Sequence, residues 1–297
     1  MKKSIPLLIL AAAAFAVAAV TCTRSNVVDP GKETVPAFET LIAVADIAAC
    51  DSQGDEATAA LVDTMPGTII VAGDIAYESG TAREFADCYE PSWGRHRSRT
   101  RPAPGNHEYV TADAKPYFDY FGVNAGPPGR GYYSFDLGAW HIISLNSNID
   151  ATAGSAQAQW LKDDLAASRS VCTLAYWHHP LFSSGLHGSG PKMRAIWQLL
   201  YDSGADVVIS GHDHHYERFA PQTAAGVLDS TRGIREFIVG TGGRSHYPAL
   251  FAQPNTERRA DKSDGVLRLK LRARDYAWEF VPTVRGGATD SGTTMCH

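Results

Sequence analysis

The chain has 297 residues, of which 44% are hydrophobic and 20% are charged, and its formal net charge is −5. This composition is typical of a globular protein rather than a disordered one. It argues against a nucleic-acid or anionic-lipid surface, which needs clustered Lys and Arg. The one basic cluster, Arg95 to Arg101, is followed by two prolines and is interpreted as a solvated loop. We therefore expect no nucleic-acid partner.

The N-terminus has the pattern of a secretory signal peptide, because Lys2 and Lys3 precede an apolar run that ends among small residues. A membrane-spanning helix needs about 20 apolar residues. This run is shorter and is followed by polar residues, so we expect no spanning segment after processing. Cys22 leaves open a lipoprotein signal, with a lipid anchor on this cysteine. We expect an exported protein (periplasmic, secreted or a surface lipoprotein), with a signal at 1–22, a linker at 23–38 and one folded domain at 39–297.

Four cysteines remain after the signal, namely Cys50, Cys88, Cys172 and Cys296. Export implies an oxidising compartment, where cysteines form disulfides. None of the four has the Cys-x-x-Cys spacing of a zinc site. Four cysteines allow three pairings, and sequence alone does not choose among them. We favour Cys50 with Cys88 and Cys172 with Cys296.

Short apolar runs alternate with amphipathic stretches from residue 40 onward. The runs predict buried strands at 41–45, 68–72, 173–177 and 207–210. The amphipathic stretches predict helices at 55–65, 155–168 and 191–203. A hairpin is expected at 132–137 and 139–145, with further strands at 234–239, 266–271 and 276–281. This order predicts an α/β fold, a two-sheet β-sandwich flanked by helices with a largely parallel central sheet.

Polar side chains stand at the carboxyl end of each predicted strand, which is where open α/β sheets bind ligands. Taken singly, such residues are usually structural, since an Asp after a strand is often a helix N-cap and Gly-Asn is common in turns. Here five loops carry them in succession, which is difficult to explain without a metal site. The five loops contain Asp46, Gly73-Asp74-Ile75-Ala76-Tyr77, Pro104-Gly105-Asn106-His107-Glu108, His178-His179-Pro180 and Gly211-His212-Asp213-His214.

Together with the Tyr216-Glu217-Arg218 segment that follows, these motifs resemble those of the calcineurin-like metallophosphoesterases. They are most similar to the purple acid phosphatases of the bacterial, single-domain type. The resemblance extends from about residue 40 to residue 218. Its most discriminating feature is Tyr77, three residues after Asp74. It implies the calcineurin-like metallophosphoesterase fold for residues 39–297.

The resemblance also implies a pair of metal ions. One ion would be bound by Asp46, Tyr77 and His214, the other by Asn106, His178 and His212, and Asp74 would bridge both. Ions in such sites lie about 3.5 to 4 Å apart. Phenolate, carboxylate and imidazole suit Fe(III) at the first position, whereas neutral Asn and His ligands suit Zn, Fe(II) or Mn at the second. The resulting site charge of about +2 would attract phosphate monoester dianions.

Two histidines outside the ligand set are expected to act on the substrate. His107 and His187 resemble the phosphate and leaving-group partners of the family, although His187 is also compatible with an ordinary loop histidine. Gly188 stands where plant members tend to have a further histidine, and Asp46 lacks the glycines usual around that aspartate. Other residues of the motifs are interpreted as supporting or packing groups (His179, Asp213, His215) and as a structural ion pair (Glu217 with Arg218).

The function expected from the resemblance is acid phosphatase-like, namely the hydrolysis of small phosphate monoesters by a metal-bound hydroxide. A phosphodiesterase or nucleotide hydrolase on the same core is the alternative within the superfamily. A non-catalytic cell-surface binding protein is the alternative of another class, and it predicts missing ligands, whereas all seven are present.

Overall fold

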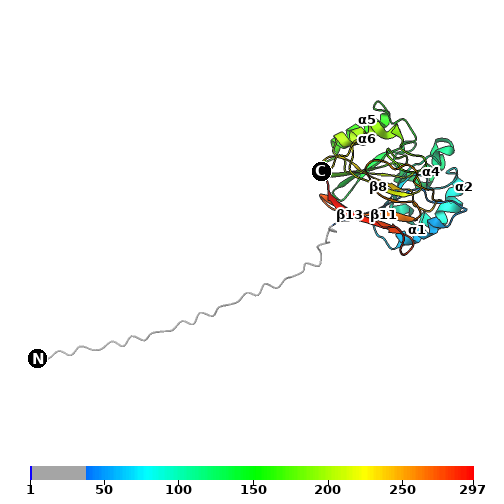
Figure 1. The fold of residues 1–297 in the computed structure, drawn as a ribbon, viewed down its shortest axis with the longest axis horizontal. Helices are drawn as coiled ribbons and strands as arrows, with labels where there is room; N and C mark the ends of the chain where they lie inside the picture. The colour runs from blue at the N-terminus through cyan, green and yellow to red at the C-terminus, as the bar shows by residue number, and fades with distance from the viewer. Residues whose placement is uncertain (2–37) are drawn as a thin grey trace. The chain divides into compact units, whose positions relative to one another are not determined.

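Two β-sheets and the helices on their outer faces make up the part of the chain that the computed structural model describes, residue 1 and residues 38–297 (Figure 1). The predicted signal, the possible anchor at Cys22 and nearly all of the predicted linker lie outside these residues. Residues 38–297 belong to one unit. None of the described helices is long and apolar enough to cross a membrane.

The first sheet has the strand order β13-β12-β11-β1-β2-β3 and the second β10-β8-β9-β7-β6-β5-β4. The strands of the first sheet are β1 (Glu39–Val44), β2 (Thr68–Ala72), β3 (Thr100–Ala103), β11 (Gly265–Leu271), β12 (Asp275–Pro282) and β13 (Asp290–Met295). Those of the second are β4 (Tyr133–Leu137), β5 (Trp140–Ser144), β6 (Cys172–Tyr176), β7 (Val207–Ser210), β8 (Tyr216–Phe219), β9 (Arg235–Val239) and β10 (Thr256–Ala260).

Helices cover the outer face of each sheet, as α5 and α6 on one side and α1, α2 and α4 on the other illustrate (Figure 1). The longer ones are α1 (Gly54–Asp63), α4 (Lys115–Phe121), α5 (Ala156–Ala167) and α6 (Arg194–Asp202), and α2 (Ala82–Glu84), a π-helix (Phe85–Tyr89) and α3 (Glu90–Trp93) form one continuous segment. Short 3₁₀ turns lie at 94–99, 108–110, 112–114, 122–125 and 191–193.

Strand β1 shows how the sequence pattern produces these layers. Leu41 and Ala43 point into the core between the two sheets, whereas Ile42 and Val44 pack on the other face with Val62 of α1. Side chains of a strand alternate between faces, and every position from Leu41 to Val44 is fully buried. A continuous apolar run is therefore the expected sequence of a strand that is covered on both sides.

The α/β class and the two-sheet sandwich are confirmed, and each predicted strand and helix lies within three residues of an observed one at either end. The expectation of a largely parallel central sheet is only partly right. In each sheet a parallel core, β1-β2-β3 or β5-β6-β7-β9, is extended by antiparallel strands. The antiparallel hairpin is confirmed as β4 and β5.

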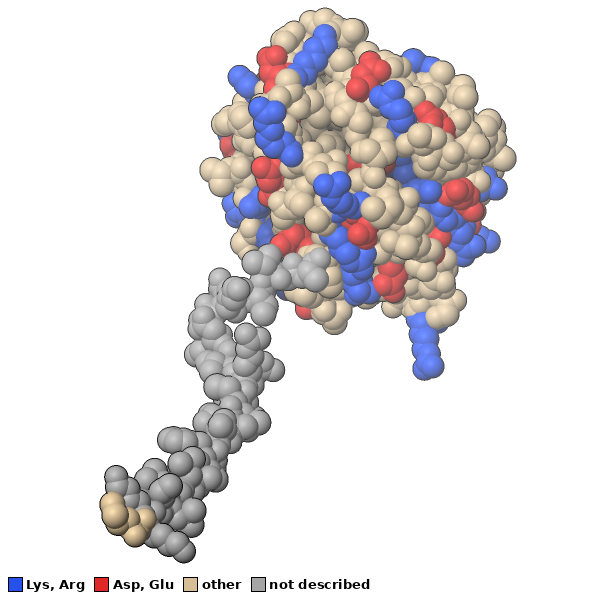
Figure 2. All heavy atoms as spheres, turned by 90° about the vertical axis from the view of Figure 1, so that its left-hand side faces the viewer, with Lys and Arg blue, Asp and Glu red and all other residues tan. Residues whose placement is uncertain are grey.

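The basic cluster is not a free solvated loop, which corrects our interpretation. Arg95 donates to the carboxylate of Asp63 in α1 at 2.7 and 2.8 Å. Arg99 donates to main-chain carbonyls at the end of α1, including Met65 O at 2.7 Å, and Arg101 lies in β3. On the face drawn in Figure 2, basic and acidic side chains are interspersed and form no large patch of one sign.

The structure contains both disulfides that we favoured, Cys50–Cys88 and Cys172–Cys296. Cys172 belongs to β6, an inner strand of the second sheet, and Cys296 follows the last strand, β13. This bond therefore connects the end of the chain, in the first sheet, to the core of the second.

A buried histidine in β5 lies between two carboxylates, away from the predicted metal ligands. His141 Nδ1 is 2.9 Å from Asp136 and its Nε2 is 2.8 Å from Asp164 of α5. Burial alone would lower the pKa of His141, but the hydrogen bonds to Asp164 and Asp136 raise it above its ordinary value. The imidazolium form thus joins the hairpin to the helix that covers it.

Candidate metal centre

The five predicted loops meet at the carboxyl ends of the two parallel strand cores. Main-chain hydrogen bonds continue the ladders into these loops, for example from Asp46 N to Gly73 O at 3.2 Å and from Gly211 N to His178 O at 3.0 Å. Ala45 N also donates to Val239 O at 3.0 Å and so joins the two sheets. The predicted convergence of these loops at one edge is confirmed.

One set of side chains gathers around the hydroxyl of Tyr77. This hydroxyl donates to Asp46 Oδ1 at 2.7 Å and lies 3.2 Å from His214 Nε2. His214 Nε2 is in turn 3.4 Å from Asp46 Oδ1. The three residues come from different loops, so only the fold brings together their phenol, carboxylate and imidazole.

A second set gathers around His178 Nε2, which lies 3.0 Å from Asn106 Oδ1 and 3.2 Å from His212 Nδ1. Asp74 stands between the two sets. Its Oδ2 is 3.0 Å from His178 Nε2 and 3.4 Å from the Tyr77 hydroxyl. All seven predicted ligands are therefore in one place, divided into the two predicted groups with the predicted bridging residue between them.

The loops hold three of these residues in backbone conformations that non-glycine residues rarely adopt. Asp46, Asp74 and His212 have φ values of 60°, 50° and 71°. Such conformations cost roughly 1 to 3 kcal/mol each and persist where the surroundings enforce them. The position of Asp74 also requires glycine at residue 105, because a Cβ there would lie 2.0 Å from Asp74 Oδ1.

The histidines are oriented by hydrogen bonds on the far side of their rings. His178 Nδ1 donates to Ala72 O at 2.8 Å, and His214 Nδ1 donates to Ser245 O at 2.6 Å. Such bonds fix the tautomer and leave the other nitrogen free to bind a metal ion. In both residues that nitrogen, Nε2, faces the carboxylates.

Electrostatics show how the cluster balances its negative charge. Burial raises the pKa of Tyr77 far above its usual value, and the charges of Asp46 and Asp74 raise it further. Burial alone would lower the pKa of His178, but the charge of Asp74 and the hydrogen bond to it raise this pKa to about 9. For His212, burial and the positive His178 lower the pKa to about 3. A metal ion balances the same negative charge, and its binding displaces protons from ligands of this kind.

The donor set therefore fits a pair of cations. Asp46, Asp74 and His178 place one ligand atom each within 4.8 Å of one another, and His178, His179 and His212 do the same. We favour Asn106 over His179 for the second group, because His179 Nδ1 already lies 2.8 Å from Ser147 Oγ. The ring of His179 packs against that of His212, with centroids 4.5 Å apart, as expected of a packing residue.

Glu108 is the main structural residue of the site that sequence reasoning did not identify. Its buried carboxylate accepts four main-chain N–H bonds, from Asp74 (3.0 Å), Ile75 (2.8 Å), Ala76 (3.3 Å) and Gly105 (2.7 Å). Burial and the charge of Asp74 raise its pKa to about 7. Glu108 thus ties the loop of Asp74 to the loop of Asn106. The only signal in the sequence was its place at the end of the Gly105-Asn106-His107-Glu108 motif.

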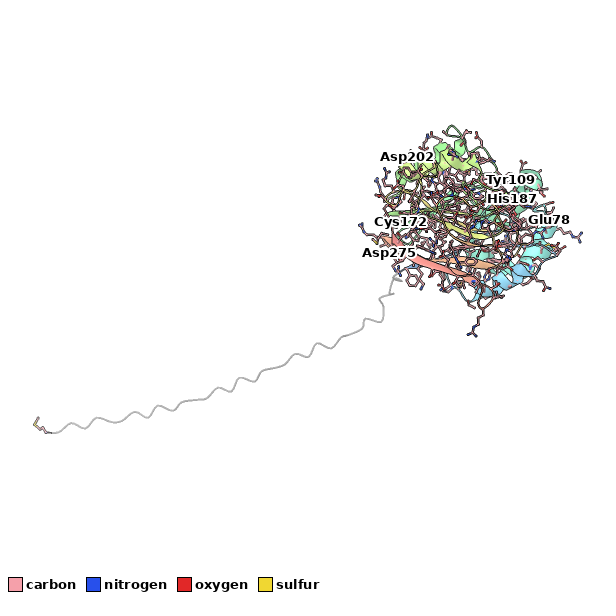
Figure 3. All side chains as sticks on the ribbon, in the orientation of Figure 1. Glu78, Tyr109, Cys172, His187, Asp202 and Asp275 are labelled. Carbon is pink, nitrogen blue, oxygen red and sulfur yellow. A yellow bond between two sulfur atoms is a disulfide. The ribbon has the colours of Figure 1, made fainter. Side chains whose placement is uncertain are left out.

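His107 and His187 both lie beside the ligand set. The ring of His107 packs on Tyr77 with centroids 4.3 Å apart, and its Nε2 is 3.7 Å from Asp74 Oδ2. The exposed ring of His187 is 4.4 Å from that of His212. In the view of Figure 3, His187 lies on the same side of the molecule as Tyr109 and Glu78, opposite Cys172 and Asp275.

Asp213 holds the loop of His187 in place by hydrogen bonds, as expected of the supporting residue that the sequence predicts. Its Oδ1 accepts from His187 N at 2.9 Å, and its Oδ2 accepts from the Ser183 hydroxyl. A Cβ at Gly185 would lie 2.2 to 2.5 Å from this carboxylate. Glycine is therefore needed there for the loop to approach Asp213.

The expected ion pair of Glu217 with Arg218 is wrong. The two residues are adjacent in β8, so their side chains point to opposite faces. Glu217 accepts from Ser184 N at 2.9 Å and lies 3.0 Å from His215 Nε2. Arg218 instead pairs with Asp290 of β13, at 2.6 Å.

The sequence model of the family described as Calcineurin-like phosphoesterase matches residues 40–216. This chain belongs to the calcineurin-like phosphoesterase family. Purple acid phosphatase 15 of Arabidopsis thaliana is 33% identical over 195 residues, which cover 53% of this chain and 37% of the plant protein. The uncharacterized protein Rv2577 of Mycobacterium tuberculosis is 28% identical over 247 residues, covering 67% of this chain and 47% of that one. The chain thus spans less than half the length of these curated relatives.

Solved structures confirm the calcineurin-like phosphoesterase fold. Purple acid phosphatase PPD1 from yellow lupin seeds has a TM-score of 0.77 at 18% identity, covering 87% of this chain and 54% of that chain. GAP50, described as the anchor in the inner membrane complex of Plasmodium, has a TM-score of 0.67 at 13% identity, covering 88% and 90%. Since proteins described as a phosphatase and as an anchor share the fold, an argument for function has to rest on the site.

Proposed function

We propose that this chain hydrolyses phosphate monoesters at a centre of two metal ions. The observation that carries the proposal is the position of Asp74 Oδ2, which faces the Tyr77 hydroxyl on one side and His178 Nε2 on the other. A carboxylate between two groups of metal-binding side chains is suited to bridge two ions. Family membership and the similarity to purple acid phosphatases support the same reaction.

In this proposal the two groups of side chains favour different metal ions. Asp46, Tyr77 and His214 offer carboxylate, phenolate and imidazole, which favour Fe(III). Asn106, His178 and His212 offer neutral donors, which favour Zn, Fe(II) or Mn. Bound ions of this kind supply positive charge for the phosphate and lower the pKa of water from about 15.7 to near 7.

The remaining residues orient the reacting groups. His107 is fixed by its Nδ1, which lies 2.6 Å from Glu78 O, so its Nε2 faces the centre and is placed to contact a phosphate oxygen. His187 stands on the exposed side, where the leaving group of a bound ester would lie, and is assigned the role of giving it a proton. Asp213 keeps His187 in that position.

We also propose that the protein acts after export. The two disulfides support this assignment, because such bonds persist in oxidising compartments. A signal at residues 1–22 and a lipid anchor at Cys22 remain predictions.

Substitution of single ligands tests the metal assignment. Asp74→Ala removes a shared ligand and should abolish binding of both ions and nearly all activity, whereas Asn106→Ala removes a ligand of one group and should mainly weaken the second ion. Asp202→Ala, at the end of α6 and away from the labelled site residues in Figure 3, is the matched control. Metal analysis of the folded variants, together with rates on a monoester and its diester, decides the matter. An Asp74→Ala protein with two metals per chain and most of its activity would refute the proposal.

Colour tests the role of Tyr77. A phenolate bound to Fe(III) produces a visible charge-transfer band, so the oxidised iron-loaded protein should be coloured and Tyr77→Phe should be colourless while still folded. A band that is unchanged in Tyr77→Phe would exclude this ligand.

A further inference from the structure

Two loop segments, residues 183–187 and 247–253, lie side by side next to the candidate metal centre. Phe251 N donates to Ser184 O at 3.0 Å, and Gln253 N donates to Ser184 Oγ at 3.2 Å. Farther along, the ring of Tyr247 is 5.6 Å from that of His187. The segments are therefore linked at both ends, and the residues between these links are held next to one another.

The residues at and between these links expose apolar side chains. Leu186 lies between Ser184 and His187 on one segment and is 49% exposed, while Leu250 and Phe251 on the other are each 54% exposed. Within residues 38–297, four Leu or Phe side chains are this exposed, and three of them belong to these two segments. Such a concentration of exposed apolar surface is typical of a binding site. We call Leu186, Leu250 and Phe251 the apolar lip.

The two segments that carry the apolar lip have no charged side chains of their own, and the nearest charges belong to other elements, such as Asp213 at His187 N and Arg258 and Arg259 in a cavity shared with Ala249. Residues 180–191 and 245–256 contain no Asp, Glu, Lys or Arg. Arg244, at the edge of the second stretch, pairs with Glu78 and lies 3.3 Å from Asp51. An anionic group bound at the lip would therefore find no free cation within either segment.

The lip is continuous with the metal centre through Tyr247. The ring of Tyr247 stacks on that of His214, with centroids 4.5 Å apart and planes at 28°. Its hydroxyl donates to His212 O at 2.8 Å. Since His187 also packs on His212, a phosphate held by the two groups of ligands would have His187 and Tyr247 beside it. The apolar lip would lie beyond these two rings.

We propose that the apolar lip binds the leaving group of the substrate and selects monoesters whose leaving group is uncharged and apolar, such as an aryl alcohol. This inference rests on the proposed phosphatase function. Contact with the lip removes apolar surface of both partners from water, which is favourable. A leaving group with further phosphates gains nothing from the lip and loses part of its hydration.

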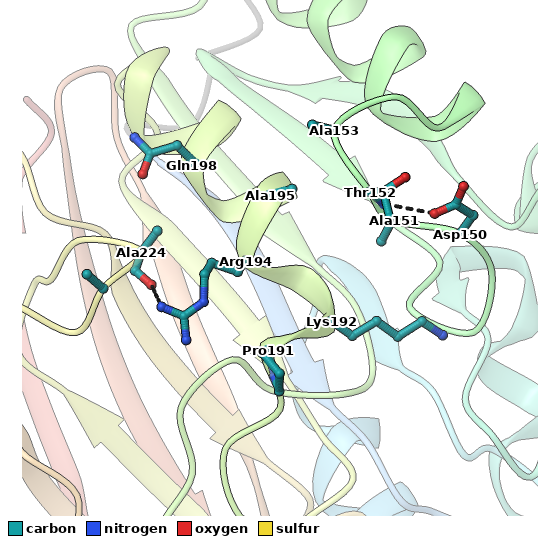
Figure 4. Close-up of a pocket in the computed structure, with 11 residues that line it drawn as sticks. Asp150, Ala151, Thr152, Ala153, Pro191, Lys192, Arg194, Ala195, Gln198 and Ala224 are labelled. Atoms are coloured by element: carbon teal, nitrogen blue, oxygen red, sulfur yellow. Dashed lines mark hydrogen bonds between the residues drawn. The ribbon is translucent and has the colours of Figure 1, made fainter.

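Other cavities carry a weaker argument. The cavity in Figure 4, of about 820 Å³, lies between the 150–153 loop, the start of α6 and residues 224–225. One of its two cations is engaged, since Arg194 donates to Ala224 O at 3.1 Å, and burial lowers the pKa of the other, Lys192. Among residues 38–297, no hydrogen bond or ring contact links this cavity to the proposed metal ligands as Tyr247 links the lip.

The test compares two esters and two inert analogues on the metal-loaded protein. Phe251→Ala and Leu250→Ala should each lower kcat/KM for 1-naphthyl phosphate by about 3- to 10-fold, less than the roughly 10- to 200-fold of a methylene in a closed pocket. Values for glycerol 1-phosphate should change less than about 2-fold. Val123→Ala, which alters a 93% exposed side chain elsewhere, should change neither. The same variants should weaken inhibition by phenylphosphonate but not by methylphosphonate.

The outcomes separate the two proposals. If both esters slow equally in the lip variants, or if phenylphosphonate binds all variants alike, the lip does not recognise the leaving group. If the wild-type protein hydrolyses neither ester, the proposed function fails. The role of the lip can then still be tested by calorimetry, which compares the binding of phenylphosphonate with that of methylphosphonate. Tighter binding of the aryl compound that is lost in Phe251→Ala would uphold the lip as an apolar site.

Discussion

Glu108→Gln tests how the loops of the metal centre are held. The carboxylate accepts two N–H bonds on each oxygen, from Ile75 and Ala76 on Oε1 and from Asp74 and Gly105 on Oε2. A glutamine has the same shape, but one end is an NH₂ group that donates. Whichever way the amide turns, two of the four buried N–H groups face another donor and lose their partner.

The expected loss follows from these two groups. A buried polar group without a partner costs about 1 to 3 kcal/mol, so Glu108→Gln should lower the free energy of unfolding by about 2 to 6 kcal/mol. This is a large part of the roughly 5 to 15 kcal/mol that stabilises a typical protein. Because the loops of Asp74 and Asn106 are loosened together, metal binding should weaken as well.

Urea unfolding at pH 8, where the carboxylate is charged, measures the first effect, and metal titration measures the second. Glu84→Gln is the matched control, because Glu84 also accepts N–H bonds from Glu78, Ser79 and Thr81 but is only half-buried. Water can replace its lost bonds, so its variant should lose about 1 kcal/mol or less. If Glu108→Gln were no less stable than Glu84→Gln, the role of Glu108 would be disproved.

Three further predictions concern catalysis, crosslinking and pH. His187→Ala should slow an alkyl phosphate by about 10² to 10⁴ and a nitrophenyl phosphate, whose leaving group needs no proton, far less. Equal slowing at constant metal content would instead assign His187 to phosphate binding. Cys296→Ser removes the disulfide to Cys172, which joins residues 124 apart in sequence. In the chain-entropy model this substitution should lower the free energy of unfolding by about 5 kcal/mol. Four free thiols in the native protein would contradict the disulfide itself. Because the pKa of His141 is raised, its contribution to stability is complete below about pH 6.5 and declines as the pH rises through the folded-state pKa. Urea unfolding at pH 6 and 8 should show a decline that Asp164→Asn flattens, and an unchanged slope would exclude His141 as its cause.

The buried strands and the side chains of the candidate metal centre are predictable because both depend on strong local signals. A run such as Leu41 to Ala45 favours a strand covered on both faces, and its carboxyl end defines where Asp46 must lie. Parallel strands bring their carboxyl ends to one edge. Local patterns were therefore enough to predict which loops meet.

The strands that the sequence did not reveal are mostly at the edges of the sheets. Strands β3, β10 and β13 are edge strands, and they contain Pro102, Arg258 with Arg259, and Thr293 with Thr294. Edge strands often carry charges and proline, which limit pairing with other chains. These residues weaken the hydrophobic pattern by which a strand is predicted, and Arg101 of β3 also falls within the basic cluster that we interpret from sequence as a solvated loop.

The hydrogen bonds by which Glu108 and Asp213 hold the loops of the site could not be predicted from sequence, and the reason is a different one. Glu108 accepts from main-chain N–H groups of the Asp74 loop, which are 32 to 34 residues away in sequence, and Asp213 accepts from His187 N, which is 26 residues away. Such contacts leave no periodic pattern. Only the three-dimensional structure shows that the carboxylates of Glu108 and Asp213 accept hydrogen bonds from the backbone of a neighbouring loop.

These supporting carboxylates also explain how the strained ligand loops persist. Asp46 and Asp74 have positive φ values, and each accepts a main-chain N–H bond from another ligand loop, from His212 at 2.9 Å and from His107 at 2.9 Å. Each side chain thus uses one oxygen to fix the neighbouring loop and turns the other toward Tyr77. Glu108 also accepts from the backbone of the Asp74 loop, so hydrogen bonds within the protein offset part of the cost of these conformations. Asp46 and Asp74 thus hold neighbouring loops as well as facing the proposed ions, so a substitution at either residue should disturb loop geometry as well as metal affinity.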